Sequence, residues 1–156
     1  MKASKRSVLF LCTGNSARSI MAEALLNVHG KGRFKAFSAG SHPTGRVNPL
    51  ALELVQKLGY PTEGLRSKSW EEFAAAGAPT IDYIITVCDS AAGEVCPIWP
   101  GHPTTAHWGF PDPKDRKDFH DVYLQIARRI DLFLALPHDD AESADLRHRV
   151  RSIGAT

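Results

Sequence analysis

A cysteine and an arginine lie six residues apart in a segment that joins a predicted strand to a predicted helix. Residues 8–11 are continuously apolar, as in buried parallel strands, and the apolar residues of 21–28 recur at the spacing of one helix face. At such a junction, unpaired backbone N–H groups and the helix dipole attract a tetrahedral anion. The sequence therefore predicts an oxyanion-binding loop made of Cys12, Thr13, Gly14, Asn15, Ser16, Ala17, Arg18 and Ser19.

Cys12 is the candidate nucleophile of this loop. The helix terminus, Arg18 and the Ser19 hydroxyl all favour a thiolate, so we expect the pKa of Cys12 to be lowered. The planar fork of Arg18 can hold two oxygens of a phosphate-like group. Gly14 lets the backbone approach closely, and Asn15 tolerates a left-handed conformation. A lone cysteine at a strand end is often only a small buried hydrophobe, but the spacing and context together favour the nucleophile.

Length and composition indicate one ordinary globular domain. The 156 residues carry a net charge of +2, which gives no reason to expect nucleic acid or membrane partners. Because we find neither a signal-peptide core nor a long apolar run, we expect a cytoplasmic protein. We also expect a monomer. Three cysteines in a reducing compartment favour transient redox chemistry over a structural disulfide framework.

Strand and helix patterns alternate along the chain. Strands are expected at 8–11, 34–39, 81–87 and 104–110. The first helix is expected to follow the loop and to end at Gly30, and the second to run from Asn48 to Gly59. A short third helix is expected from a Ser69–Glu72 capping box to Ala76, and a long fourth helix over 118–136. This order predicts a three-layer α/β domain whose site lies beyond the carboxyl ends of parallel strands, with Cys12 and Cys88 both at that edge.

The C-terminal segment is expected to be less ordered than the rest of the chain. Residues 1–137 form the predicted domain. Residues 138–156 are polar and follow Pro137 without clear periodicity. We therefore expect 138–156 to be a loosely attached tail or a frayed helix.

The loop resembles a known family. Its Cys-x5-Arg-Ser pattern is similar to the phosphate-binding loop of low-molecular-weight protein tyrosine phosphatases, and more closely to that of the arsenate reductases built on the same fold. The Thr after the cysteine and the later segment 107–113, His-Trp-Gly-Phe-Pro-Asp-Pro, favour the reductases. The resemblance covers about residues 7–136. It implies an open parallel sheet of four strands flanked by helices, the flavodoxin-like three-layer architecture.

The resemblance also implies a reaction, the reduction of arsenate to arsenite. Cys12 would attack arsenic, Asp112 would protonate the leaving oxygen, Cys88 would attack Cys12, and Cys96 would then attack Cys88. The resulting disulfide would be reduced by thioredoxin, or by glutaredoxin and glutathione. The enzyme would need this external thiol reductant but no bound cofactor or metal. The small polar residues 89–95 would let the two loop thiols approach each other.

Other functions remain open at this stage. A low-molecular-weight phosphotyrosine phosphatase would use the same loop through a phosphocysteine intermediate, and a redox-inert anion-binding module would use it without chemistry. The phosphatases tend to carry tyrosines just past the Asp-Pro pair, where Lys114 stands here. A zinc site of Cys88, Cys96, His102 and His107 is disfavoured because structural sites usually space their cysteines more closely.

Two further assignments depend on the resemblance. An Asp-Pro pair is often simple turn chemistry, so Asp115 and Asp118 are alternatives to Asp112 as the acid. Potassium-binding members of the family use residues that match Asn15, Glu23 and Ser38, together with an acidic residue near 67–69. Here Lys68 is expected to take the place of the ion.

Overall fold

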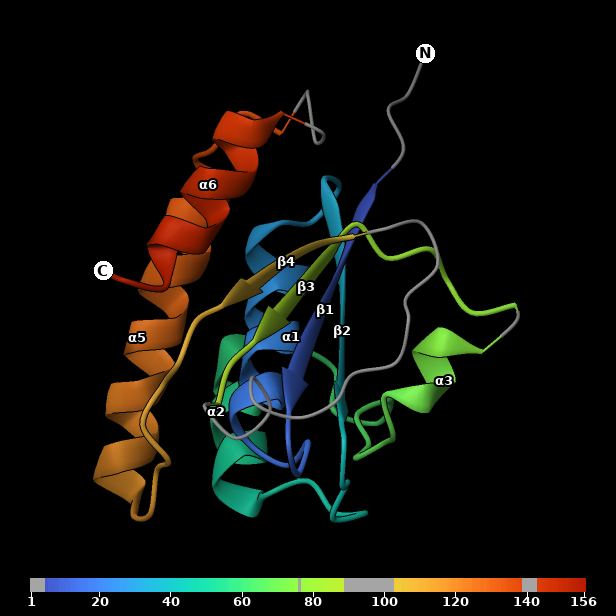
Figure 1. The fold of residues 1–156 in the computed structure, drawn as a ribbon. Helices are drawn as coiled ribbons and strands as arrows, with labels where there is room; N and C mark the ends of the chain where they lie inside the picture. The colour runs from blue at the N-terminus through green and yellow to red at the C-terminus, as the bar shows by residue number, and fades with distance from the viewer. Residues whose placement is uncertain (1–4, 76, 89–102, 139–142) are drawn as a thin grey trace.

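The computed structural model describes residues 5–75, 77–88, 103–138 and 143–156. Within them, four strands form one sheet in the order β2-β1-β3-β4, and each neighbouring pair is parallel (Figure 1). The strands are β1 (Arg6–Cys12), β2 (Phe34–Gly40), β3 (Tyr83–Thr86) and β4 (Thr104–His107). The predicted four-stranded parallel α/β sheet is therefore confirmed.

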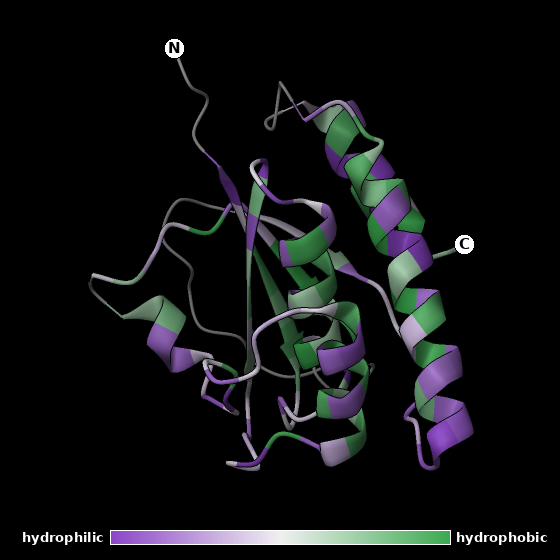
Figure 2. Ribbon diagram, turned by 180° about the vertical axis from the view of Figure 1, so that it is seen from behind, coloured by the Kyte–Doolittle hydropathy of each residue, from purple (hydrophilic) through white to green (hydrophobic). Residues whose placement is uncertain are grey.

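Helices cover both faces of the sheet. On one face, Val8 and Phe10 pack with the buried residues of α1 (Arg18–His29), α2 (Pro49–Leu58), α5 (Arg116–Leu134) and α6 (Ala144–Ile153). On the other face, Leu9 and Leu11 pack with α3 (Glu71–Ala74). The alternation along β1 follows from the strand period of two residues. Figure 2 shows the two central strands, β1 and β3, as mainly hydrophobic and the helices as striped, which is the pattern of three packed layers.

The ends of α2 follow their predicted signals. The side chain of Asn48 accepts a hydrogen bond from the Leu50 N–H at 2.8 Å, and Pro49 is the first helical residue. Gly59 ends the helix in the left-handed region, with φ of 91°. Helix α5 begins two residues before its predicted start, because the Asp115 carboxylate caps it by accepting from the Asp118 N–H at 2.8 Å.

The predicted capping box of α3 is wrong. The Ser69 hydroxyl accepts from the Glu71 N–H at 3.2 Å, one residue earlier than a capping box requires. The Glu72 carboxylate instead binds the Arg66 guanidinium, with one contact of 2.9 Å. An ion pair outside the helix thus uses the carboxylate that the capping box needed, and α3 ends at Ala74 rather than Ala76.

The expected loose tail is wrong for residues 143–156. Ser143 caps α6, and Leu146, Val150 and Ile153 are buried against β4 and α5. The indole N–H of Trp108 donates to the carbonyl oxygen of Val150 at 2.9 Å. The apolar stripe of α6 consists of only three residues within a charged sequence, so the helical spacing of its apolar residues was easily missed.

Further contacts hold α6 along β4. Arg151 donates from Nε to the carbonyl oxygen of Thr105 at 3.0 Å. Gly154 lies so close to the strand that a Cβ there would clash with the carbonyl oxygen of His107. In the part of the chain that the structure describes, no helix combines the length and the apolar character that a membrane span needs.

Replacing Leu146 with Ala tests whether α6 is part of the folded core. We expect Leu146→Ala to lower the free energy of unfolding by about 2–5 kcal/mol, because it leaves a cavity between α6 and the sheet. Urea unfolding followed by circular dichroism measures this change. Arg149→Ala, on the exposed face of the same helix, should cost less than about 0.5 kcal/mol. Equal effects of the two substitutions would mean that α6 is not packed.

Candidate active site

The loop between β1 and α1 is held from outside by its carbonyl groups. Three of these oxygens accept hydrogen bonds from backbone N–H groups of segment 42–48: Thr13 from His42 at 2.9 Å, Gly14 from Thr44 at 3.0 Å and Ser16 from Asn48 at 2.8 Å. The C=O and N–H of a peptide point in opposite directions. Outward carbonyls therefore turn the following N–H groups inward, which forms a cradle for an anion.

Asn15 supplies the left-handed turn of this loop, with φ of 47°, as predicted. Its side chain is fully buried, donates to the Ser19 hydroxyl at 2.9 Å and accepts from the Lys68 N–H at 2.9 Å. The residue thus joins the loop to α1 and to the segment before α3. The φ angle is sparsely populated outside glycine, and these two bonds keep it in place.

Gly40 at the end of β2 is a site residue that sequence reasoning missed. A Cβ at this position would lie 2.8 Å from the Cys12 carbonyl oxygen and 3.0 Å from the Asn15 nitrogen, and it would clash with the Thr13 carbonyl. Backbone atoms cannot move aside as flexible side chains do, so only glycine fits. The one sequence feature that could have indicated this role is a glycine at the carboxyl end of the second predicted strand.

The structure brings the thiols of Cys12 and Cys88 together. Both are buried, with 6% and 3% of their surface exposed. They follow from adjacent parallel strands, since β1 ends at Cys12 and Cys88 comes two residues after β3. The Cys12 thiol is hydrogen-bonded to Cys88. The Thr13 N–H donates to Cys88 Sγ at 3.3 Å, and Thr13 Oγ1 lies 3.6 Å from the same sulfur.

The expected lowering of the Cys12 pKa is wrong for this state. The hydrogen bond to Cys88 raises the pKa most, followed by burial and by the charge on Cys88. Arg18 and the Gly14 N–H act in the predicted direction, but they are outweighed. The loop and its arginine could be read from neighbouring residues in the sequence. The Cys88 thiol, which raises the pKa instead, follows a strand more than 70 residues away in the chain. The contact with Cys88 therefore raises the pKa of Cys12 above its ordinary value.

Arg18 and Asp112 also lie together. Arg18 Nη1 donates to the Phe110 carbonyl oxygen at 2.9 Å, and Nη2 is 3.6 Å from Asp112 Oδ1. The arginine side chain is largely buried, whereas 68% of the Asp112 side chain is exposed. Lys114 Nζ lies 4.0 Å from the other carboxylate oxygen of Asp112. A carboxyl group at the mouth of the cradle is accessible to a leaving group, as a general acid must be.

The alternative acids have structural partners instead. Asp115 caps α5, and Asp118 Oδ2 accepts from the Lys114 N–H at 3.3 Å. Both carboxylates therefore serve the start of the helix. Of the three candidates, Asp112 is the one whose ion pair is with Arg18.

Glu23, Ser38 and Lys68 form a polar cluster beneath the loop. The Ser38 hydroxyl donates to Glu23 Oε1 at 2.5 Å, and burial raises the pKa of Glu23. Burial lowers the pKa of Lys68, while the charge of Glu23 opposes that shift. Lys68 Nζ donates to the Arg66 carbonyl oxygen at 2.9 Å. The charge of Glu23 thus acts on the ammonium of Lys68, and the expected replacement of the ion by Lys68 stays a prediction.

Some predicted residues lie outside the described part of the chain. Cys96 and His102 are among them, so the attack of Cys96 on Cys88 and the zinc alternative stay predictions. His107 Nδ1 lies 2.7 Å from the Thr86 hydroxyl. Among the described residues, no group of three or more His, Cys, Asp or Glu side chains is arranged to hold a metal ion.

Comparison with known proteins adds independent information. A family model described as low molecular weight phosphotyrosine protein phosphatase matches residues 7–148. An arsenate reductase from Brevibacillus brevis is 38% identical over 131 residues, which cover 83% of this chain and 94% of that protein. A solved structure described as an arsenate reductase in the phosphate binding state has a TM-score of 0.71 and 27% identity, covering 83% of this chain and 97% of that one.

A second solved structure is a thioredoxin-dependent arsenate reductase from Corynebacterium glutamicum. It has a TM-score of 0.63 and 26% identity, and the match covers 84% of this chain. This chain spans 61% of that protein's length.

Gly40→Ala tests the close approach of β2 to the loop. We expect the affinity for inorganic phosphate, measured by isothermal titration calorimetry, to fall at least about tenfold, because the added methyl group displaces the backbone that presents the N–H groups. Gly64→Ala is the matched control, since a Cβ there meets nothing within 4 Å. Equal affinities of the two variants would show that the loop tolerates the methyl group.

Cys88→Ala tests the origin of the raised Cys12 pKa. Removing Cys88 removes the largest cause of the shift and leaves Arg18 and the Gly14 N–H, so the pKa of Cys12 should fall. The pH dependence of Cys12 alkylation by iodoacetamide, located by mass spectrometry, measures it. The midpoint should move to lower pH than in the unmodified protein, and Arg18→Ala should move it to higher pH. An unchanged midpoint in Cys88→Ala would contradict this explanation.

Proposed function

We propose that this chain, which belongs to the low molecular weight phosphotyrosine protein phosphatase family, is an arsenate reductase. The observation that carries the proposal is the contact between two buried thiols, Cys12 and Cys88, at an anion-binding loop. Hydrolysis of a phosphate ester needs one nucleophile. Reduction of arsenate needs two electrons, which two thiols supply when they form a disulfide.

The first step is substitution at arsenic. The inward N–H groups of the loop and the Arg18 guanidinium bind the oxygens of arsenate, and Cys12 attacks arsenic as an oxygen leaves. Hydrogen arsenate and a thiol give a thiol–arsenate adduct and water. The leaving oxygen takes one proton from the Cys12 thiol and one from Asp112 or from the oxyanion itself, so it departs as water. The raised pKa of Cys12 fits this step, because the incoming dianion is itself a base and can accept the thiol proton.

The second step transfers the electrons. Cys88 attacks Cys12 Sγ, the S–As bond breaks, and its electron pair reduces arsenic to arsenite. The contact between the two thiols supports this step, because Cys88 already meets its target before substrate binds. The Thr13 N–H at 3.3 Å from Cys88 Sγ can stabilise negative charge on the attacking sulfur.

The third step returns the enzyme to its reduced form. In the proposed relay, Cys96 attacks Cys88, and thioredoxin reduces the resulting Cys88–Cys96 disulfide by exchange. The thioredoxin dependence of the C. glutamicum neighbour supports this choice over glutathione. A reducing compartment is needed to keep the three thiols ready, so the proposal places the protein in the cytoplasm.

A phosphatase is the second candidate, and the family match favours it. Cys12, Arg18 and Asp112 are sufficient for phosphate ester hydrolysis through a phosphocysteine. The exposed Lys114 lies beside Asp112, at a position where the phosphatases tend to carry a tyrosine that walls a phenyl ring. That difference favours a small inorganic dianion over a phosphotyrosine.

Two assays separate the candidates. We expect arsenate-dependent oxidation of a thioredoxin chain, and little hydrolysis of p-nitrophenyl phosphate. Cys12→Ser should abolish both activities, and Arg18→Ala should cost about 2–4 kcal/mol of transition-state stabilisation in both. Cys88→Ser should abolish arsenate reduction and spare any ester hydrolysis. Background arsenate turnover with rapid ester hydrolysis would reverse the order of the two candidates.

The relay has its own readout within the same experiment. After one turnover without reductant, mass spectrometry should find a Cys88–Cys96 disulfide. In a parallel sample supplied with glutathione alone, a stable glutathione adduct at Cys12, with Cys88 and Cys96 both still reduced, would overturn the thioredoxin scheme while leaving arsenate reduction intact. Full multiple-turnover activity of Cys88→Ser would overturn the role of the second thiol.

A further inference from the structure

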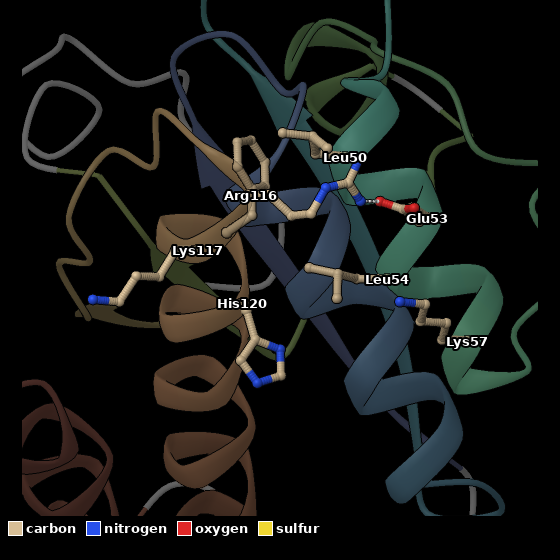
Figure 3. A pocket seen from close by; sticks show the side chains of 8 residues that line it. Leu50, Glu53, Leu54, Lys57, Arg116, Lys117 and His120 are labelled. Carbon is tan, nitrogen blue, oxygen red and sulfur yellow. Dashed lines mark hydrogen bonds and ion pairs between the residues drawn. The ribbon is translucent and has the colours of Figure 1, made fainter.

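A cavity of about 530 Å³ lies between α2 and α5 (Figure 3). Among the described residues, its lining comes from 50–57 and 116–120, so it is separate from the loop that follows Cys12. The volume falls in the range of sites that bind small molecules. The proposed reaction does not use this space.

The floor of the cavity is apolar. Leu50 and Leu54 stand one helical turn apart on α2, and both are only half-buried. Phe119 of α5 is almost fully buried and completes the floor. When a ligand covers apolar surface that is partly open between two helices, water is released from that surface and the free energy is lowered.

The rim of the cavity is positively charged. Arg116 reaches from α5 to Glu53 on α2 and forms an ion pair with it, so the one carboxylate of the lining is already neutralised. The remaining charged or titratable side chains of the lining are Lys57, Lys117 and His120.

Their directions distinguish these three residues. In Figure 3, Lys57 from α2 and His120 from α5 lie on the two sides of Leu54, whereas Lys117 points away from α2. Lys57 carries three N–H donors, and His120 carries at least one. Donors from both helices therefore stand at one end of the apolar floor.

We propose that this cavity binds a small amphipathic anion, an aliphatic or aromatic carboxylate. Its apolar body would cover Leu50, Leu54 and Phe119, and its carboxylate would lie between Lys57 and His120. The charge of the rim and the pairing of Glu53 select an anion over a cation or a neutral apolar compound. This site is independent of the proposed arsenate chemistry, so either proposal can fail alone.

The test uses octanoate as the probe and the full chain as the protein. In ¹H–¹⁵N NMR titrations, we expect saturable shifts in residues 50–57 and 116–120, and none centred on residues 12–19. Lys57→Gln should weaken octanoate binding about fivefold, the size expected for a partly exposed charge contact. Lys31→Gln, at an exposed lysine between α1 and β2, is the matched control and should bind as the unmodified protein does.

Four outcomes would overturn the proposal. They are no saturable shift with octanoate, shifts centred on the Cys12 loop, equal affinities of Lys57→Gln and Lys31→Gln, and 1-octanol binding as tightly as octanoate. The last two would show that the rim charges do not select the ligand. Because Lys57 is exposed, its substitution should not disturb the fold.

Discussion

The anion-binding loop depends on hydrogen bonds made on its outer side. Backbone groups inside a loop cannot point inward unless the opposite ends of their peptides are satisfied elsewhere. Segment 42–48 meets that need by donating to the carbonyls of Thr13, Gly14 and Ser16. The segment reaches them because β2 ends at Gly40, where the absence of a side chain lets the two backbones touch. The active site is thus shaped by a strand that contributes no reacting group.

The second constraint is the order of the strands. Because β1 and β3 are parallel neighbours, their carboxyl ends meet at one edge, and residues that follow them become adjacent despite their separation in sequence. Cys12 and Cys88 are such residues. Their contact raises the pKa of Cys12. In the proposed reaction, the proximity that would let Cys88 attack Cys12 therefore also raises the pKa of the nucleophile.

Local signals in the sequence were sufficient for the strand, loop and helix around Cys12 and for both ends of α2. These features depend on neighbouring residues, such as the Asn48 cap and the Gly59 turn. The failures were all tertiary. The Cys12 pKa depends on Cys88, the lost capping box depends on Arg66, and α6 depends on its packing against β4. Gly40 was visible as a strand end, but its contact with the loop was not.

Helix α6 has a consequence for solubility. Strand β4 lies at the edge of the sheet, where carbonyls that face away from β3 would offer a template for another chain. Arg151 binds one such carbonyl, that of Thr105, and Gly154 lies against that of His107. A short edge strand shielded in this way resists pairing with a second molecule. The helix that was expected to be a loose tail thus covers the β4 edge of the sheet.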